Sequence, residues 1–265
     1  MLTQTVEKLH GLGLRAMADM LADPAALSAS DELSFEDRLA LLVDREWDAR
    51  ENRRLTNRLR TARLKQNACV EDVDFKTPRG LDRGMILSLA AGHWIAAHHH
   101  CIISGPTGVG KTFLACALGN RACRLGYSVV YRRVSRLLEE LALARADGSY
   151  RLLSQRLAKT QLLVLDDWGL MPLAPEVAQD VLDLLEDRNG SGSTLIVTQI
   201  PVSQWHARIG DPTIADAILD RLVHGAHRIE MRGESMRKLR GRSTDTAAAD
   251  GDEFAVQTSG PEGAF

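Results

Sequence analysis

The first 66 residues carry apolar positions at helical spacing. Between Thr5 and Met20, apolar side chains recur every three or four residues, which predicts one amphipathic helix. Asp23-Pro24 ends it. Ser34-Phe35-Glu36-Asp37 resembles a capping box, in which a serine and an acidic side chain satisfy free N–H groups at a helix start. A second helix is therefore expected from Phe35 to about Leu64.

From about residue 85 onward, short and continuously apolar segments alternate with amphipathic helices. Such segments are typical of a parallel sheet covered by helices on both faces. The expected strands are Cys101–Ser104, Val129–Arg132, Leu162–Leu165, Thr194–Thr198 and His227–Met231. The expected helices include Phe113–Leu125, Val134–Ala146, Glu176–Arg188 and Thr213–Val223. The pattern predicts an α/β domain.

These patterns divide the chain into four parts. Residues 1–66 form a helical module, and residues 67–84 form a connector with a turn at Thr77-Pro78-Arg79-Gly80. Residues 85–240 form the α/β domain. Residues 241–265 are small and polar, then rich in Gly and Asp. We expect this tail to be disordered, because it can bury little apolar surface.

The composition is that of a soluble globular protein. The chain has 265 residues, of which 45% are hydrophobic and 26% charged, enough for a large domain and a smaller module. No apolar run approaches ~18 residues, and the N-terminus lacks a signal-peptide core, so neither a membrane span nor secretion is expected. The four cysteines form no C-x-x-C pair, which fits a reducing cytoplasm.

Positive charge is concentrated at one place. From Arg45 to Lys65, eight basic residues face three acidic ones, a local charge of +5 in a chain whose net charge is −2. This asymmetry is typical of nucleic-acid binding. The alternative is a solvated helix face with pairs such as Glu46 and Arg50. The candidate contacts to duplex DNA phosphates are Arg50, Arg53, Arg54, Arg58, Arg60, Arg63 and Lys65.

One segment matches G-x-x-x-x-G-K-[ST], the loop that wraps nucleotide phosphates. It comprises Gly105, Pro106, Thr107, Gly108, Val109, Gly110, Lys111 and Thr112, here called the phosphate loop. Its glycines let the backbone turn tightly and direct N–H groups at an anion. Lys111 brings a cation to the β- and γ-phosphates, and Thr112 offers a hydroxyl to Mg²⁺. The helix beginning at Phe113 presents its positive end to the same phosphates.

Polar residues follow two of the expected strands. Asp166 and Asp167 come directly after Leu165, at the strand end that faces the ligand crevice in such sheets. Asp166 is expected to hold Mg²⁺, and Asp167 to orient or deprotonate the attacking water. Gln199 follows Thr198 and either lies near the γ-phosphate or is an ordinary polar strand end.

Arg221 lies late on an expected helix. It either pairs with Asp216 or Asp220, or reaches into a neighbouring subunit's nucleotide site. Arginine suits the second role because its guanidinium stays charged and binds phosphate through two hydrogen bonds. The basic end of Gly233–Lys238 either approaches the phosphates or is a solvated tail.

Together these segments resemble the IstB-like ATP-binding proteins, the helper ATPases of bacterial insertion-sequence transposition, which are related to the DnaC-type helicase loaders of the AAA+ class. The resemblance covers most of residues 1–240. Its most specific segments are Gly105–Thr112, Leu162–Leu173, Pro201–Trp205, Gly210–Leu222 and Gly233–Lys238, and Phe35–Arg63 also looks like the family's helical module.

The resemblance implies an AAA+ P-loop NTPase core with a five-stranded parallel sheet, a small all-α N-terminal module and no C-terminal lid. It implies ATP and Mg²⁺ as cofactors, ATP-dependent assembly of a homo-oligomer on duplex DNA, and delivery of that complex to a partner transposase. Arg221 looks like the arginine finger that acts in trans, Gln199 like the sensor-1 residue and Arg237 like the sensor-2 residue.

This sequence departs from the family pattern twice. Many relatives carry glutamate where this chain has Asp167, so slow hydrolysis is expected, and many carry asparagine at the position of Gln199. Three alternatives stay open: a DnaC-like loader of a replicative helicase, a nucleotide-gated scaffold without hydrolysis, and a P-loop kinase. A kinase needs an acceptor pocket and usually a closing lid, whereas the acidic pair suits activation of water.

Overall fold

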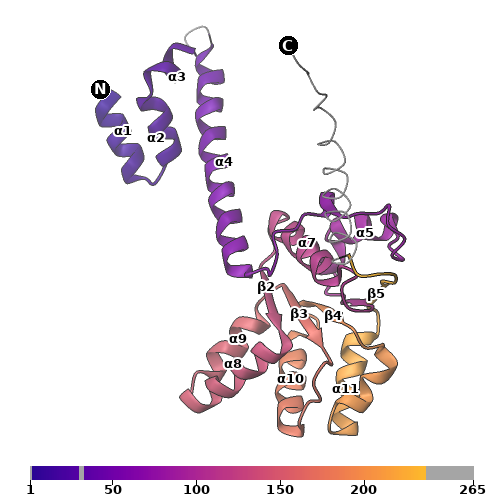
Figure 1. Cartoon of the computed structure of the whole chain (residues 1–265). Coiled ribbons are helices and arrows are strands. Elements are labelled where there is room, and N and C mark those ends of the chain that lie inside the picture. Colours follow the sequence, from indigo (N-terminus) through magenta and orange to yellow (C-terminus); the bar gives the residue numbers. More distant parts are fainter. Residues whose placement is uncertain (1, 30–32, 237–265) are drawn as a thin grey trace, which may run out of the picture. The chain divides into compact units, whose positions relative to one another are not determined.

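The computed structural model of this protein describes residues 2–29 and 33–236 (Figure 1). The chain forms two compact units, residues 1–61 and 62–265. The tail expected over residues 241–265 lies outside the described residues.

The first unit is helical, as expected, but its helices are shorter than the apolar pattern suggests. The helices are α1 (Leu2–Gly11), α2 (Arg15–Ala22), α3 (Pro24–Ala29) and α4 (Phe35–Ala62). The single helix predicted over Thr5–Met20 is wrong, because the chain turns at Gly13, whose φ is +75°. The Gly13 N–H donates to the His10 carbonyl and the Leu14 N–H to the Leu9 carbonyl, which closes α1 as a Schellman motif.

Ser34 caps α4 as predicted, but the acidic half of the capping box differs, because the Asp37 carboxylate binds the Ser34 hydroxyl and not a backbone N–H. The backbone N–H of Asp37 donates to Ser34 Oγ at 3.1 Å, and Ser34 Oγ donates to the Asp37 carboxylate at 2.8 Å. The helix therefore starts at Phe35. It ends at Ala62, earlier than Leu64, where Arg63 adopts a left-handed conformation with a φ of +50°.

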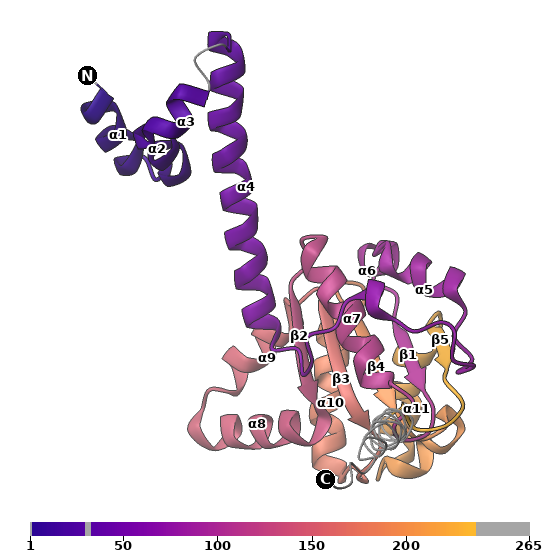
Figure 2. The same ribbon diagram turned by 45° about the horizontal axis from the view of Figure 1, so that its top comes forward.

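The second unit contains a five-stranded parallel sheet, as the sequence predicts. Its strands are β1 (Cys101–Ser104), β2 (Val129–Arg133), β3 (Leu162–Trp168), β4 (Ser193–Thr198) and β5 (His227–Glu230). Their order is β2-β3-β4-β1-β5 (Figure 2). All these strands run parallel, so their carboxyl ends lie at one edge of the sheet. Only β4 separates β1 from β3, so the phosphate loop after β1 and the acidic pair of β3 lie close together at that edge.

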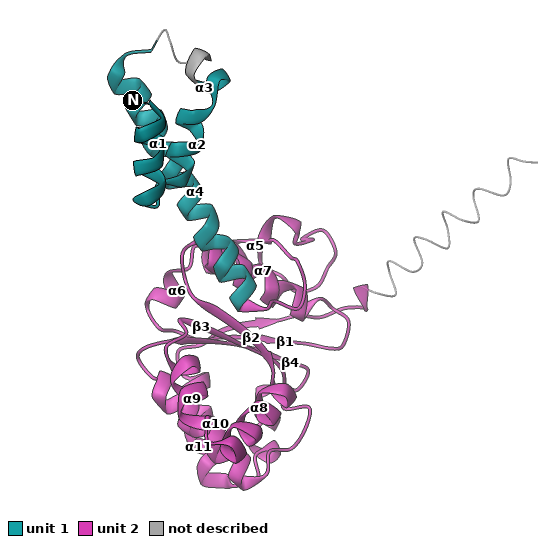
Figure 3. Ribbon diagram, turned by 90° about the vertical axis from the view of Figure 1, so that its left-hand side faces the viewer, with its two compact units in different colours: residues 1–61 teal, residues 62–265 magenta. Residues whose placement is uncertain are grey.

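Helices cover both faces of this sheet (Figure 3). One face carries α5 (Arg83–Ala90), α6 (His93–Ala96) and α7 (Lys111–Arg124), and the other carries α8 (Val134–Asp147), α9 (Tyr150–Ala158), α10 (Pro175–Arg188) and α11 (Pro212–Val223). Side chains along each strand point alternately to the two faces of the sheet. Ile102, Leu163 and Ile196 point to the face that α8–α11 cover and pack into the core there. Trp168 and Trp205 lie in that core with their ring centroids 5.5 Å apart. The helices α5, α6 and α9 were not among those predicted.

A buried arginine braces the end of the sheet where its strands begin. Arg188 is 1% exposed, and its guanidinium donates to the backbone carbonyls of Leu157, Thr160 and Ser193. Burial lowers its pKa to about 10, so the side chain is charged at neutral pH. It therefore joins the end of α9, the start of β4 and its own helix α10.

Replacing Arg188 by methionine removes three hydrogen bonds and leaves their carbonyls buried without this donor. We expect the free energy of unfolding to fall by about 2 kcal/mol or more. Chemical denaturation followed by circular dichroism measures this loss. The control is Arg136→Met: Arg136 and its partner Glu139 are exposed, so a change of at most ~0.5 kcal/mol is expected. Equal losses for the two variants would contradict the bracing role.

Candidate nucleotide-binding site

The phosphate loop joins β1 to α7 and depends on three glycines. Gly105, Gly108 and Gly110 have φ values of +147°, +88° and +101°, a region that other residues rarely adopt. A Cβ at Gly105 would overlap the Met231 carbonyl oxygen, and a Cβ at Gly108 would overlap the Ser235 side chain. The glycines thus serve the turn and also admit the segment that follows β5.

Lys111 starts α7 and turns back into the loop. Its side chain is 6% exposed, and its Nζ donates to the carbonyls of Gly105 at 2.7 Å and Pro106 at 2.8 Å. Burial lowers the pKa of this ammonium, and the carboxylates of Asp166 and Asp167 oppose that shift. A desolvated cation held by carbonyls gains from an anion nearby.

Asp166 is the centre of the site. Its carboxylate is fully buried and accepts hydrogen bonds from the Thr112 hydroxyl at 2.9 Å and the Tyr131 hydroxyl at 2.5 Å. Its other oxygen accepts from the Asp167 N–H at 2.9 Å. Burial and the hydrogen bond to Asp166 raise the pKa of Tyr131, which keeps this phenol a donor. The structure thus brings Thr112 and Asp166 together, 54 residues apart in sequence.

Asp167 lies inside β3 and not after it. The expectation that this strand ends at Leu165 is wrong, because β3 continues to Trp168 through an irregularity in its pairing with β4. Asp167 adopts a φ of +63°, which breaks the alternation of side chains along the strand. Its carboxylate forms an ion pair with Arg133 at 3.6 Å. Arg133 ends β2, and sequence reasoning did not single it out.

A cavity of about 290 Å³ lies beside the phosphate loop. Gln199 contributes to its lining, and its side-chain oxygen accepts from the Thr107 hydroxyl at 2.5 Å. Another wall is formed by Lys65 and Gln66, just before the connector, and by Asp72, Asp74 and Arg79 of the connector. No motif in the connector pointed to this role, since its residues meet the loop only through tertiary contacts.

Arg221 lies on α11 and is not among the described residues that line this cavity. Its Nη2 donates to the Glu186 carboxylate of α10 at 2.8 Å. The alternative in which Arg221 pairs with Asp216 or Asp220 is therefore wrong; the carboxylates of these two residues lie 3.4 and 3.5 Å from Nε2 of His206 and His224. Arg237 lies outside the described residues.

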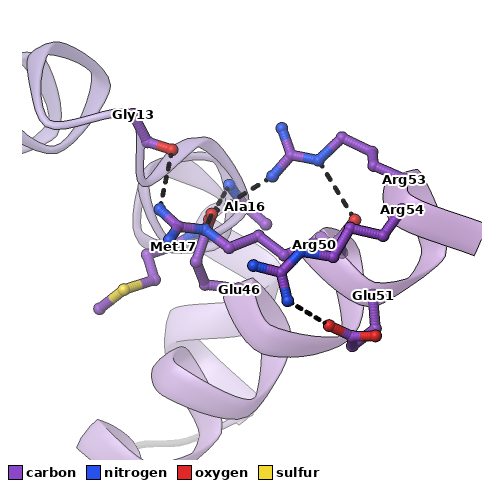
Figure 4. Close-up of polar contacts among 9 residues, drawn as sticks. Gly13, Ala16, Met17, Glu46, Arg50, Glu51, Arg53 and Arg54 are labelled. Carbon is purple, nitrogen blue, oxygen red and sulfur yellow. Dashed lines mark hydrogen bonds and ion pairs between the residues drawn. The ribbon is translucent and has the colours of Figure 1, made fainter. Parts of the chain in front are cut away.

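The basic part of α4 is partly neutralised by its own acidic residues (Figure 4). Arg50 and Arg53 form ion pairs with the buried carboxylate of Glu46 at 2.8 and 3.3 Å, and Arg54 pairs with Glu51 at 2.6 Å. The remaining candidates form no ion pair with other described residues; they are Arg58, Arg60, Arg63 and Lys65. The pair of Glu46 and Arg50 that the solvated-face alternative names is thus present.

Comparison with known families decides what this arrangement is. The family model of the IstB-like ATP binding protein matches residues 7–244. The chain belongs to the IstB-like ATP binding protein family. The insertion sequence ATP-binding protein y4pL of Sinorhizobium fredii is 51% identical over 240 residues, or 91% of this chain and 98% of that protein. The IS1162 ATP-binding protein of Pseudomonas fluorescens is 48% identical over 205 residues, or 77% of this chain and 89% of that protein.

Solved structures show which fold this IstB-like protein has. The crystal structure of DnaI aligns with a TM-score of 0.54 and 22% identity, over 62% of this chain and 91% of that one. DnaA bound to AMPPCP and single-stranded DNA aligns with a TM-score of 0.56 and 15% identity, over 69% and 56%. The chain is an ATP-binding protein with the AAA+ P-loop fold. No helix in residues 2–29 or 33–236 is long and apolar enough to cross a bilayer.

Replacing Lys111 by alanine removes the ammonium group that donates into the phosphate loop from the start of α7. We expect ATP affinity to fall by about 100-fold or more, since a buried site then binds phosphate without this charge-assisted hydrogen bond. Titration with a fluorescent ATP analogue measures this. Lys159→Ala, an exposed lysine at the end of α9, serves as the control and should bind as the unchanged protein does. Retained affinity in Lys111→Ala would refute the site.

Proposed function

We propose that this protein is a DNA-binding ATPase that assembles on duplex DNA in the ATP state and assists a partner transposase. One observation carries the proposal: the Thr112 hydroxyl donates to the buried Asp166 carboxylate beside the phosphate loop, in a chain that belongs to an insertion-sequence ATP-binding family. Oxygen ligands and a loop of free N–H groups suit a nucleotide triphosphate with its metal ion.

The residues present fit Mg²⁺. This ion prefers oxygen ligands, and the Thr112 hydroxyl and the Asp166 carboxylate lie 2.9 Å apart, with no cationic side chain of the described residues hydrogen-bonded to either. When bound, Mg²⁺ would neutralise charge on the β- and γ-phosphates. Tyr131 keeps the Asp166 carboxylate oriented toward Thr112. Lys111 leaves the carbonyls of Gly105 and Pro106 for phosphate oxygens.

Asp167 is the residue we assign to orienting the attacking water. Its carboxylate is one-third exposed, so water can reach it, as a general base requires. It also lies at the same strand end as Asp166. The ion pair with Arg133, at 3.6 Å, competes with water for this carboxylate. Aspartate reaches less far than glutamate, so this arrangement supports slow hydrolysis.

Arg221 is assigned to the nucleotide of a neighbouring subunit. In its own subunit the side chain lies on α11 and binds Glu186, whose carboxylate is about half exposed. Such an ion pair contributes little and exchanges easily for a phosphate. The γ-phosphate then favours the oligomer, because it supplies the negative charge that Arg221 of the neighbour binds.

DNA binding is assigned to the basic residues that form no ion pair with the described part of the chain. Arg58, Arg60, Arg63 and Lys65 provide charge for DNA phosphates without breaking such a pair. Arg50, Arg53 and Arg54 would first give up Glu46 or Glu51. Contacts of this kind position a duplex without reading its sequence, and repetition over several subunits adds their weak affinities.

The transposase is favoured over a replicative helicase as the partner. The relatives with 48–51% identity are named as insertion-sequence proteins, whereas the likeness to DnaI, at 22% identity, concerns the fold alone. Retention of the transposase from the same insertion sequence by the ATP-loaded protein tests this. Retention of a replicative helicase in its place would favour the loader.

Phosphate release with and without duplex DNA tests the ATPase and the role of Arg221. The unchanged protein should hydrolyse ATP faster on DNA. Arg221→Ala should keep ATP affinity and lose the stimulated turnover by about 10³-fold, the contribution of an arginine finger in NTPases.

Glu186→Gln is the matched variant, because it removes the same ion pair and frees Arg221. If Arg221 acts in trans, Glu186→Gln keeps the stimulated turnover. If both variants lose it equally, Arg221 is an internal salt bridge. No phosphate release under any condition would favour a scaffold that binds ATP without hydrolysis, and a protein that stays monomeric on DNA with ATP and magnesium would refute the assembly.

Neutralising Arg58, Arg60 and Arg63 to glutamine should weaken DNA binding and flatten its salt dependence; Lys65 is left unchanged because it lines the nucleotide cavity. The slope of log affinity against log salt should decrease by about 0.9 for each DNA phosphate that the variant no longer binds. Fluorescence anisotropy with a short duplex at several salt concentrations measures it. The control replaces Arg136, Arg151 and Arg156, exposed arginines of α8 and α9, and should leave the slope unchanged. An unchanged slope in the first variant would place the DNA surface elsewhere.

A further inference from the structure

Two donors from distant segments hold the phosphate loop. Nη1 of Arg79, in the connector, donates to the Val109 carbonyl at 3.0 Å. The backbone N–H of Met236, after β5, donates to the Gly108 carbonyl at 3.0 Å. Arg79 is 6% exposed although it is charged and lies in an irregular segment. Two consecutive peptide groups of the loop are therefore fixed from outside it.

Because the trans peptide group is planar, these contacts also fix the direction of the neighbouring N–H groups that could bind phosphate. In each peptide the C=O and the following N–H point in opposite directions. Fixing the Gly108 and Val109 carbonyls therefore fixes the N–H groups of Val109 and Gly110, which point away from the two donors. Neither N–H has an acceptor among the residues that the structure describes. Consecutive N–H groups held in this way form an anion-binding nest.

From this geometry we propose that Arg79 is a positioning residue for nucleotide binding. Its guanidinium holds the peptide between Val109 and Gly110 so that the Gly110 N–H is directed to the phosphate site before a nucleotide arrives. The inference rests on the nucleotide site proposed above and goes beyond the loop itself, because it makes the connector part of that site.

The surroundings of Arg79 are built for close contact with the loop. Gly110 has no Cβ, and one placed there would lie 2.9 Å from Nη1 of Arg79. Nη2 donates to the Asp74 carbonyl, and the Arg79 carbonyl accepts from the Arg232 N–H at 2.9 Å. The connector turn is thus tied to the segment after β5, and the guanidinium has little freedom to move.

The burial of Arg79 is not optimal for stability. Its Nε is buried and finds no partner among the described residues, which has a free-energy cost that an apolar side chain would avoid. Arg188 shares this feature at the other end of the sheet, and it does not line the cavity beside the phosphate loop. The two arginines can therefore be compared directly: each is buried and donates to backbone carbonyls, but of the two Arg79 alone donates to the phosphate loop.

The test compares Arg79→Met with Arg188→Met in the full chain. Fluorescent ATP and ADP analogues are titrated at a temperature at which circular dichroism shows each variant folded. Arg79→Met should lose about 10-fold to 100-fold in affinity, since a hydrogen bond to an anion loses its preorganised geometry. The loss should be equal for ATP and ADP, because the loop binds the phosphates that both share. Arg188→Met should be less stable but bind within about twofold of the unchanged protein.

Arg79→Lys gives a second measurement that does not depend on the methionine variant folding. Lysine keeps the charge but cannot donate to Val109 and Asp74 together, so an intermediate loss of affinity is expected. Unchanged affinity in Arg79→Lys and Arg79→Met, or equal losses in Arg79→Met and Arg188→Met, would overturn the proposal. Absence of binding by the unchanged protein would instead refute the nucleotide site, and Lys111→Ala confirms that the titration reports on that site.

Discussion

The hydrogen bonds to the buried carboxylate of Asp166 are the constraint on which the site depends. A charge removed from water in this way is tolerated only when donors surround it. The donors are the Thr112 hydroxyl, the Tyr131 hydroxyl and the Asp167 N–H, which come from α7, β2 and β3. Satisfying one carboxylate therefore aligns three elements, and the parallel order of the strands brings them to one edge. The hydrogen bonds that build the candidate site therefore also hold α7, β2 and β3 together.

The features predicted correctly from the sequence depend on residues that are close together along the chain. Short apolar segments identified the strands, the phosphate-loop motif located the candidate nucleotide site, and Ser34 indicated the start of α4. The failures concern contacts between distant residues. The partner of Arg221 is Glu186, 35 residues away, and the partner of Arg79 is Val109, 30 residues away. The break at Gly13 was missed because the apolar spacing continues across it, although a glycine at that place is a helix-ending signal.

The Glu46 carboxylate in the N-terminal unit binds backbone N–H groups and arginine side chains at the same time. Its carboxylate accepts hydrogen bonds from the N–H groups of Ala16 and Met17, near the start of α2, and it also pairs with Arg50 and Arg53 (Figure 4). Hydrogen bonding with Arg50 lowers its pKa and keeps it ionised. The arginines nearest to it thus help hold α2 against α4. A count of basic residues therefore overstates the uncompensated positive charge of this helix.

The left-handed backbone at Asp167 limits how this ATPase can be engineered. Aspartate tolerates a φ of +63° better than most residues do, because its short side chain interacts locally with the backbone. Glutamate would extend its carboxylate further than aspartate, but it has less preference for this conformation. If Asp167 orients the attacking water as proposed, a glutamate at this position would gain reach toward that water at the cost of folding stability.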